Sequence, residues 1–372
     1  MLVKRFKDFV ECNPTVRLKK GQYYGNTDID SIKVGLKYTV GNEPIKYTGQ
    51  SGSKFSPGDT IMARITPCLE NGKIAMYVGG TDSIGSTELF VFRAIPGISD
   101  KDYIYYFMKQ RYVREYATNS MTGASGRQRA DIKFIRKMKC DFPELEEQEK
   151  IGAFLSLYDD LIENNNKRIK ILEKMAEELY KEWFVRFRFP EYEDTEFEDG
   201  IPVGWHYEKL DKLVEIHYGK DHKGIDYGNI PVYGSGGIMR YCNRYLYNGE
   251  SVLIPRKGSL NNVMYINAPF WSVDTLFYTK PIRNCIAKYL YFVLSSIDLE
   301  SYNSGAALPS MTTNILYHMK IIVPTANSLA LFDECVGKLF DEVVLLKKKN
   351  NNLIKQRDLL LPRLMSGKLK VK

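Results

Sequence analysis

The chain has 372 residues, which is longer than one ordinary hydrophobic core and predicts two domains, with or without spacers. Its 44 % hydrophobic and 26 % charged residues are typical of soluble globular proteins, and no stretch approaches the roughly 20 apolar residues that a membrane span needs. The net charge of +8 suits a polyanionic partner, and we expect a cytoplasmic protein that makes no use of a membrane.

The cysteine and histidine patterns argue against disulfide frameworks and metal sites. The six cysteines are scattered singly and form no Cys-x-x-Cys pair, so we expect reduced thiols. The four histidines show no metal-binding spacing such as His-Glu-x-x-His. We therefore expect no metal ion on this chain.

Residues 1–143 have the sequence pattern of a β-rich domain that also contains helix. Short runs of Val, Ile, Tyr and Phe alternate with Gly, Pro, Asn and Asp, which is typical of strands bounded by turns. We expect strands over residues 59–65, 73–78 and 89–93, and a short amphipathic helix over residues 103–110.

Residues 144–189 predict one long helix. From Ile151 to Trp183, residues taken at alternating steps of four and three are apolar with the single exception of Asn165. A seam of this length is typical of a coiled coil. At the standard rise the helix would span roughly 50 Å. Pro190 and an acidic linker, residues 190–200, end it.

The pattern then begins again, which indicates an internal repeat. Residues 190–324 form a second domain that includes the linker, and its runs at 249–254, 276–278, 289–294 and 314–324 echo runs of the first domain. An offset of 181 carries the first seam onto residues 325–372, where eight of the ten seam positions are apolar. We expect an α+β protein with two domains related by a pseudo-two-fold axis, separated by two long antiparallel coiled-coil helices.

Antiparallel helices aligned at their midpoints place Asn165 opposite Asn350. Opposed asparagines in an apolar seam can fix the register of two helices at some cost in stability. The alternative is that both amides are solvated in a loosely packed bundle. Arg357, the other polar residue of the second seam, is interpreted as an edge residue whose stem packs while its charge reaches water.

The familiar catalytic motifs are missing from the sequence. We find no Gly-x-x-x-x-Gly-Lys-Ser/Thr loop, no Gly-x-Gly-x-x-Gly after a strand, no Gly-x-Ser-x-Gly elbow and no Asn/Asp-Pro-Pro-aromatic tetrad of amino-methyltransferases. We therefore expect a protein without catalytic activity of its own, rather than a stand-alone methyltransferase or nuclease.

Basic residues beside glycines are the best candidates for contacts with double-stranded DNA. The loop at residues 122–129 joins flexible backbone to side chains whose geometry fits guanine and adenine edges. The alternative is a structural turn with solvated arginines, and the counterpart loop at 304–310 lacks both arginines, as a different half-site or an idle loop would allow. The predicted DNA contacts are Arg64, Lys73, Ser125, Arg127, Gln128, Arg129, Lys220, Lys223, Arg240, Arg256 and Lys257.

Several runs of the chain together resemble one family. They are Pro143-Glu-Leu-Glu-Glu-Gln148, Pro202-Val-Gly-Trp205, Leu360-Leu-Pro-Arg-Leu-Met-Ser-Gly367, and residues 63–73, 85–88 and 123–129. In combination, over nearly the whole chain, they resemble the specificity subunit of type I restriction–modification enzymes. One departure is that the first domain lacks the Pro-x-Gly-Trp run of the second.

The resemblance implies two target-recognition domains that each read one half of a bipartite DNA site. It also implies partners: two modification subunits that carry S-adenosylmethionine, and restriction subunits that use ATP and Mg. No cofactor is expected on this chain. The alternative function is a coiled-coil scaffold that binds proteins without reading a DNA sequence.

Overall fold

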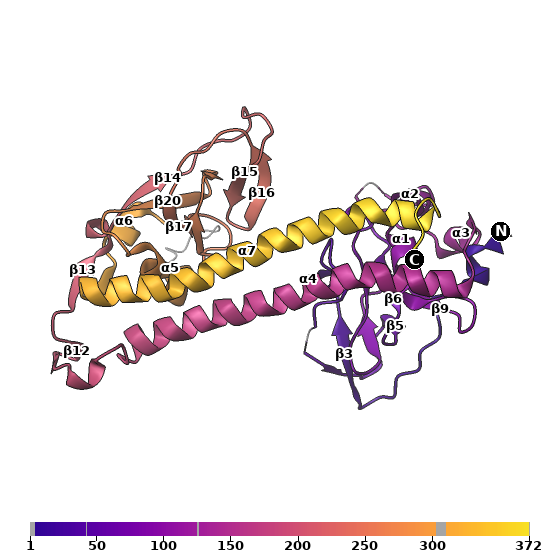
Figure 1. Ribbon diagram of the computed structural model, residues 1–372, viewed down its shortest axis with the longest axis horizontal. Helices are drawn as coiled ribbons and strands as arrows, with labels where there is room; N and C mark the ends of the chain where they lie inside the picture. Colours follow the sequence, from indigo (N-terminus) through magenta and orange to yellow (C-terminus); the bar gives the residue numbers. More distant parts are fainter. Residues whose placement is uncertain (1–3, 42, 125, 303–309, 372) are drawn as a thin grey trace. The chain divides into compact units, whose positions relative to one another are not determined.

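The computed structural model describes residues 4–41, 43–124, 126–302 and 310–371. Contacts divide the chain into two units, and each combines one α+β domain with parts of two long helices (Figure 1). The first unit comprises residues 1–169 and 345–372, and the second comprises residues 170–344. None of the helices in the described ranges has both the length and the apolar sequence needed to cross a bilayer.

The first domain contains two four-stranded sheets, with strand orders β2-β9-β6-β7 and β4-β3-β8-β5. A further pair, β1 and β10, joins the two ends of the domain. The strands are β1 (Lys4–Arg5), β2 (Val10–Cys12), β3 (Tyr23–Thr27), β4 (Ile45–Lys46), β5 (Ser53–Phe55), β6 (Thr60–Ala63), β7 (Ile74–Met76), β8 (Ser83–Gly85), β9 (Leu89–Ala94) and β10 (Lys139–Cys140). The helices are α1 (Lys101–Lys109), α2 (Arg111–Thr118) and α3 (Ile132–Arg136).

The sheet β2-β9-β6-β7 is buried on both faces. Because side chains alternate along a strand, Met62 and Phe90 pack in one cluster with the apolar residues of α1, while Ile61 and Val91 pack with Phe55 of the other sheet. This double burial explains why β6 and β9 read as continuous apolar runs. The predicted strands and the predicted short helix are confirmed, with small differences at their ends.

The second domain repeats the strand order of one sheet in full and of the other, a three-stranded sheet β16-β15-β19, in part, which confirms the internal repeat. The order β14-β20-β17-β18 reproduces β2-β9-β6-β7, and the parallel pairing of β15 with β19 corresponds to that of β3 with β8. The strands are β11 (Phe197–Glu198), β12 (Ile201–Pro202), β13 (His206–Lys209), β14 (Val214–Tyr218), β15 (Ile230–Gly234), β16 (Gly237–Cys242), β17 (Glu250–Pro255), β18 (Met264–Asn267), β19 (Trp271–Ser272), β20 (Leu276–Pro281) and β21 (Lys320–Val323). The helices α5 (Ala287–Ser296) and α6 (Thr313–Tyr317) correspond to α1 and α3.

Both domains begin with a strand that pairs with a strand near the end of the same domain. In the second domain β13 pairs with β21, and Trp205, just before β13, packs against Phe184 and Phe189. In the first domain β1 pairs with β10 in the same antiparallel sense. The first domain therefore joins its two ends in the same way although it lacks the Pro-x-Gly-Trp run.

The two long helices are α4 (Leu145–Tyr180), which continues as a π-helical turn to Val185, and α7 (Ala326–Met365). Phe187, at φ 56°, takes the backbone out of the helical conformation two residues after that turn. Within each unit the helix segments run antiparallel, and the seam positions of both helices are buried or half-buried. The predicted antiparallel coiled-coil helices are confirmed.

The two seam asparagines meet in the first unit. The Asn165 side-chain amide donates to Asn350 Oδ1 at 2.8 Å, and the Asn350 amide donates to Asn166 Oδ1 at 2.9 Å. Asn350 is 7 % exposed, so these bonds satisfy an amide that has little access to water. The contact predicted from the register is present, and its role in fixing that register stays a prediction.

The interpretation of Arg357 as a solvated edge residue is wrong. Its side chain is fully buried and donates to Asp159 of α4 and to the carbonyl oxygen of Gly35 at 3.0 Å. Asp159 is 2 % exposed and also accepts a hydrogen bond from the Tyr106 hydroxyl. A buried guanidinium is stable here because a carboxylate outside the apolar seam neutralises it.

A second buried cation extends the network into the first domain. Lys37 is 2 % exposed, and its ammonium donates to Asp102 of α1 at 2.5 Å and to Ser156 of α4 at 2.6 Å. The loop that contains Gly35 and Lys37 is thus joined by charged hydrogen bonds to α1, α4 and α7. These contacts hold the first domain on the helix pair.

Replacing Asp159 by leucine should destabilise the first unit by about 3 kcal/mol, because Arg357 keeps only the half-exposed carboxylate of Asp358 as an acidic partner. The double change Asp159→Leu/Arg357→Leu should recover most of that loss. All three tryptophans lie in the second unit, so tryptophan fluorescence would not report unfolding of the first unit. The measurement is therefore amide hydrogen exchange of residues 145–169 in rising urea.

The matched control for Asp159→Leu is Glu146→Leu, which breaks an exposed pair with Lys150 on the same helix. Exposed pairs contribute little, and the control should shift stability by no more than about 0.5 kcal/mol. Equal effects of the two substitutions would contradict a stabilising role for the buried pair.

Stability should also depend on pH through Lys109. Burial and the nearby charge of Arg357 lower the pKa of this ammonium to about 8, although Asp358 lies 3.3 Å away. The unfolded chain keeps the proton to about pH 10.4, so it binds more protons than the folded chain between these values. The stability of the protein relative to a Lys109→Met variant should therefore rise from pH 8 to 10. Parallel stability profiles for the two proteins, measured by urea unfolding, would exclude this titration.

Candidate nucleic-acid interface

A junction of three backbone segments at one end of the first domain carries two of the predicted DNA contacts. Arg64 follows β6, and its N–H donates to the carbonyl oxygen of Glu88 at 2.9 Å. The carbonyl oxygen of Arg64 accepts from the N–H of Ala130 at 2.8 Å, and Ile65 forms a β-bridge with Arg129. The backbone therefore sets the positions of Arg64, Glu88 and Arg129 next to one another.

The side chains of this junction form a charged group around Glu88. Arg129 donates to the Glu88 carboxylate from Nε at 2.9 Å and from Nη2 at 2.8 Å, and Arg64 Nε lies 3.4 Å from it. The Arg64 guanidinium also lies over the Phe90 ring, 5.6 Å from its centre. The hydrogen bonds from Arg129 and the neighbouring charges lower the pKa of Glu88. Two cations on one carboxylate leave a net positive charge at the surface.

The loop beside this junction presents Arg127 to solvent. Gly123 and Gly126 have φ values of 120° and 79°, which glycine adopts readily. The Gln128 carbonyl oxygen accepts from the Thr66 N–H at 3.0 Å, and the Gln128 side chain is half-buried. Ser125 lies outside the described residues.

The second domain contains the same backbone junction with different side chains. The Arg256 N–H donates to the carbonyl oxygen of Thr275 at 2.8 Å, and the Arg256 carbonyl oxygen accepts from the Met311 N–H at 2.9 Å. Lys257 forms a β-bridge with Ser310. Arg256, Thr275 and Ser310 thus occupy the places of Arg64, Glu88 and Arg129.

The surroundings of Arg256 also differ from those of Arg64. Its guanidinium lies over the Tyr218 ring at 5.3 Å from the centre, and Nη1 lies 3.4 Å from the Asp274 carbonyl oxygen. Lys257 is exposed beside it. The second domain therefore presents one arginine and one lysine at the position where the first presents two arginines and a glutamate.

Of the remaining predicted DNA contacts, two are hydrogen-bonded to neighbouring loops and two are exposed. The Lys73 ammonium donates to the Ile29 carbonyl oxygen and to Asp30, each at 3.0 Å, and the Arg240 guanidinium donates to His222 Nδ1 and to the Ile225 carbonyl oxygen, each at 2.9 Å. Both side chains thus hold neighbouring loops in place. Lys220 and Lys223 are exposed on the loop that Arg240 holds.

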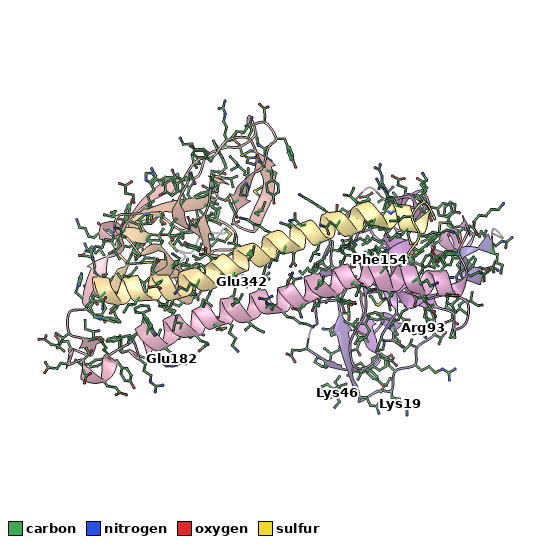
Figure 2. All side chains as sticks on the ribbon, viewed as in Figure 1. Lys19, Lys46, Arg93, Phe154, Glu182 and Glu342 are labelled. Carbon is green, nitrogen blue, oxygen red and sulfur yellow. The ribbon has the colours of Figure 1, made fainter. Side chains whose placement is uncertain are left out.

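Charged residues outside the predicted set also stand out in the first domain. Glu88 organises the arginine junction, and its signal in the sequence is an acid just before a buried strand. Lys19 and Lys46 lie at the end of the first domain away from α4 (Figure 2), where the Gly21 N–H donates to the Tyr47 carbonyl oxygen at 2.8 Å. The run Lys19-Lys20-Gly21 is the sequence signal for that basic turn.

Comparison with known proteins identifies the family. The family model described as "Type I restriction modification DNA specificity domain" matches residues 1–174 and again residues 202–356. The MjaIX type I restriction enzyme specificity subunit of Methanocaldococcus jannaschii is 26 % identical over an alignment of 301 residues; the match covers 73 % of this chain and 69 % of that protein. The EcoAI specificity subunit of Escherichia coli is 32 % identical over 131 residues, 34 % of this chain and 22 % of its own length.

The fold is also that of a solved relative. The crystal structure of the type I restriction–modification system S subunit from M. genitalium superposes with a TM-score of 0.59 at 18 % identity, covering 98 % of this chain and 96 % of the other. The two family matches fall on the two domains together with the parts of the long helices that follow them. The chain belongs to the family of type I restriction–modification DNA specificity domains, and it contains two copies of that domain.

Proposed function

We propose that this chain is the DNA sequence-recognition subunit of a type I restriction–modification complex. In this proposal each domain reads one half of a bipartite DNA site, and the helices α4 and α7 set the spacing and dock the modification subunits. The observation that carries it is the twofold occurrence of one arginine-bearing junction, at Arg64 and at Arg256, with different neighbours in each copy. The family match favours this function over a coiled-coil scaffold that binds only proteins.

The proposal assigns the chemistry to partner subunits. Two modification subunits would carry S-adenosylmethionine and methylate the DNA, and restriction subunits would use ATP and Mg for cleavage. This chain would hold no cofactor, would not be catalytic, and would act in the cytoplasm. The names of the related specificity subunits and the missing catalytic motifs in the sequence support this division of labour.

The helix lengths suit the proposed spacing. Half-sites on one face of DNA lie about 34 Å apart per helical turn, and two helices of roughly 50 Å are of the right scale to span that distance. The contact of Asn165 with Asn350 supports a fixed register between the helices. A shift of one helix along the other would separate the two side chains and leave a buried amide without a hydrogen-bond partner.

The test is methylation-site mapping in a host that carries this chain with its modification partner, against a host that lacks the chain. We expect a bipartite methylated sequence that depends on the chain. Deleting the facing heptads 169–175 and 340–346 should shorten the non-specific gap by about 10 Å, or about three base pairs. Deleting only one of the two heptads is the control, and it should disrupt the register and abolish methylation. An unchanged gap after the double deletion would exclude the spacing role.

Replacing Arg127 by alanine should relax specificity in one half-site only. The side chain is exposed on a glycine-containing loop, and a bidentate base contact would make the loss about 1–3 kcal/mol. The measurement is binding of the assembled complex to duplexes with single base changes at several salt concentrations. Lys46→Ala is the comparison variant, for which we expect uniform weakening and a shallower salt dependence. The same uniform behaviour for Arg127→Ala would show a phosphate contact instead.

A further inference from the structure

The two edges of the Arg129 guanidinium have different surroundings. The edge formed by Nε and Nη2 donates to Glu88 at 2.9 and 2.8 Å. The opposite end, formed by Nη1 and the second N–H of Nη2, has only a long contact of 3.5 Å from Nη1 to the Arg127 carbonyl oxygen among the bonds described for it. The side chain is 43 % exposed. A fork of two N–H donors is therefore available to a ligand while the other edge is fixed.

Such a fork matches a guanine. The major-groove edge of guanine carries two acceptors, O6 and N7, that an arginine binds through two parallel N–H groups. An arginine that is already held in place also loses less conformational freedom on binding than a free one. The glutamate that holds it here is itself held, since its backbone carbonyl oxygen accepts from the Arg64 N–H and its side chain is only 19 % exposed.

The second domain provides a comparison within the same chain. The backbone hydrogen bonds of the junction are the same, yet Thr275 stands in the place of Glu88 and Ser310 in the place of Arg129. Arg256 alone remains from the charged group of the first domain. Besides Lys257 at the place of Ile65 and the Tyr218 ring beside Arg256, the two junctions thus differ in the two residues that form the fixed fork.

We propose that Arg129 reads a guanine in the half-site of the first domain and that Glu88 is the positioning residue that holds it there. This inference rests on the proposed function and deepens it. The second domain has Thr275 and Ser310 in place of Glu88 and Arg129, so it lacks this pair of N–H donors and reads its half-site by other contacts.

The test uses the chain assembled with its modification subunits and measures methylation rates on duplexes in which each base pair of the site is changed in turn. Arg129→Ser should lose about tenfold or more discrimination at one G·C pair of the first half-site. Glu88→Thr should lose part of the discrimination at the same pair. Discrimination in the second half-site should stay unchanged in both variants, and it reports that the complex is intact.

The matched control is the pair Arg111 and Glu115 on α2, another arginine–glutamate pair of the first domain, with an N–O distance of 2.6 Å. The double variant Arg111→Ser/Glu115→Thr makes the same chemical changes and should leave every base preference unchanged. If Arg129→Ser does not assemble, Arg129→Lys keeps the charge without the fork, and it should show the same loss of discrimination.

A double-variant cycle separates positioning from a purely structural ion pair. Because Glu88 acts through Arg129, adding Glu88→Thr to Arg129→Ser should cause no further loss of discrimination. Additive losses, equal losses in both half-sites, or unaltered discrimination in Arg129→Ser would each overturn the inference. Failure of the proposed function is distinguishable from these outcomes, because the unchanged chain would then direct no bipartite methylation at all.

Discussion

The antiparallel contact between α4 and α7 is the interaction on which each unit of this protein depends. In the first unit it includes a buried ion pair, Asp159 with Arg357, and the hydrogen-bonded asparagines Asn165 and Asn350. Through the Gly35 carbonyl oxygen and Lys37 the same contact reaches the first domain, so domain and helix pair are held as one body. In the second unit the contact is aromatic, with Trp183 against Phe332. Each domain is thus attached to a segment of both helices.

In both domains the bonds that stabilise the fold are distinct from the side chains at the junctions, which are the candidates for DNA recognition. The strand order of one sheet and the backbone hydrogen bonds of the junction recur in both domains, and they make no use of the side chains at the junctions. Residues at positions such as Glu88 and Arg129 can therefore differ from Thr275 and Ser310 without a change of fold. Backbone bonds of this kind tolerate substitution, which is what a protein needs if its two copies are to read different sequences.

The sequence predicts the structural features that depend on local periodicity. It does not predict an interaction whose two residues are far apart in the chain. The seams follow from residue spacing along each helix, and the repeat follows from similar runs at a nearly constant offset; the structure confirms both. The burial of Arg357 does not follow from the sequence, because its partner Asp159 lies outside the seam and 198 residues away. The role of Glu88 likewise has no local pattern in the sequence, because its partner Arg129 is 41 residues away. Composition also does not reveal that Arg240 and Lys73 donate to loop carbonyls, because only the folded backbone brings those oxygens within reach.

The division of the chain also sets the order in which its parts are completed during synthesis. The second unit, residues 170–344, is a continuous stretch, whereas the first unit needs residues 345–372. Leu361 and Leu364 belong to the core of the first unit, and the buried carboxylate of Asp159 has no arginine until residue 357 has left the ribosome. The domain that is made first is therefore the last to be finished. A frameshift between the second domain and residue 357 would therefore damage the first domain as well.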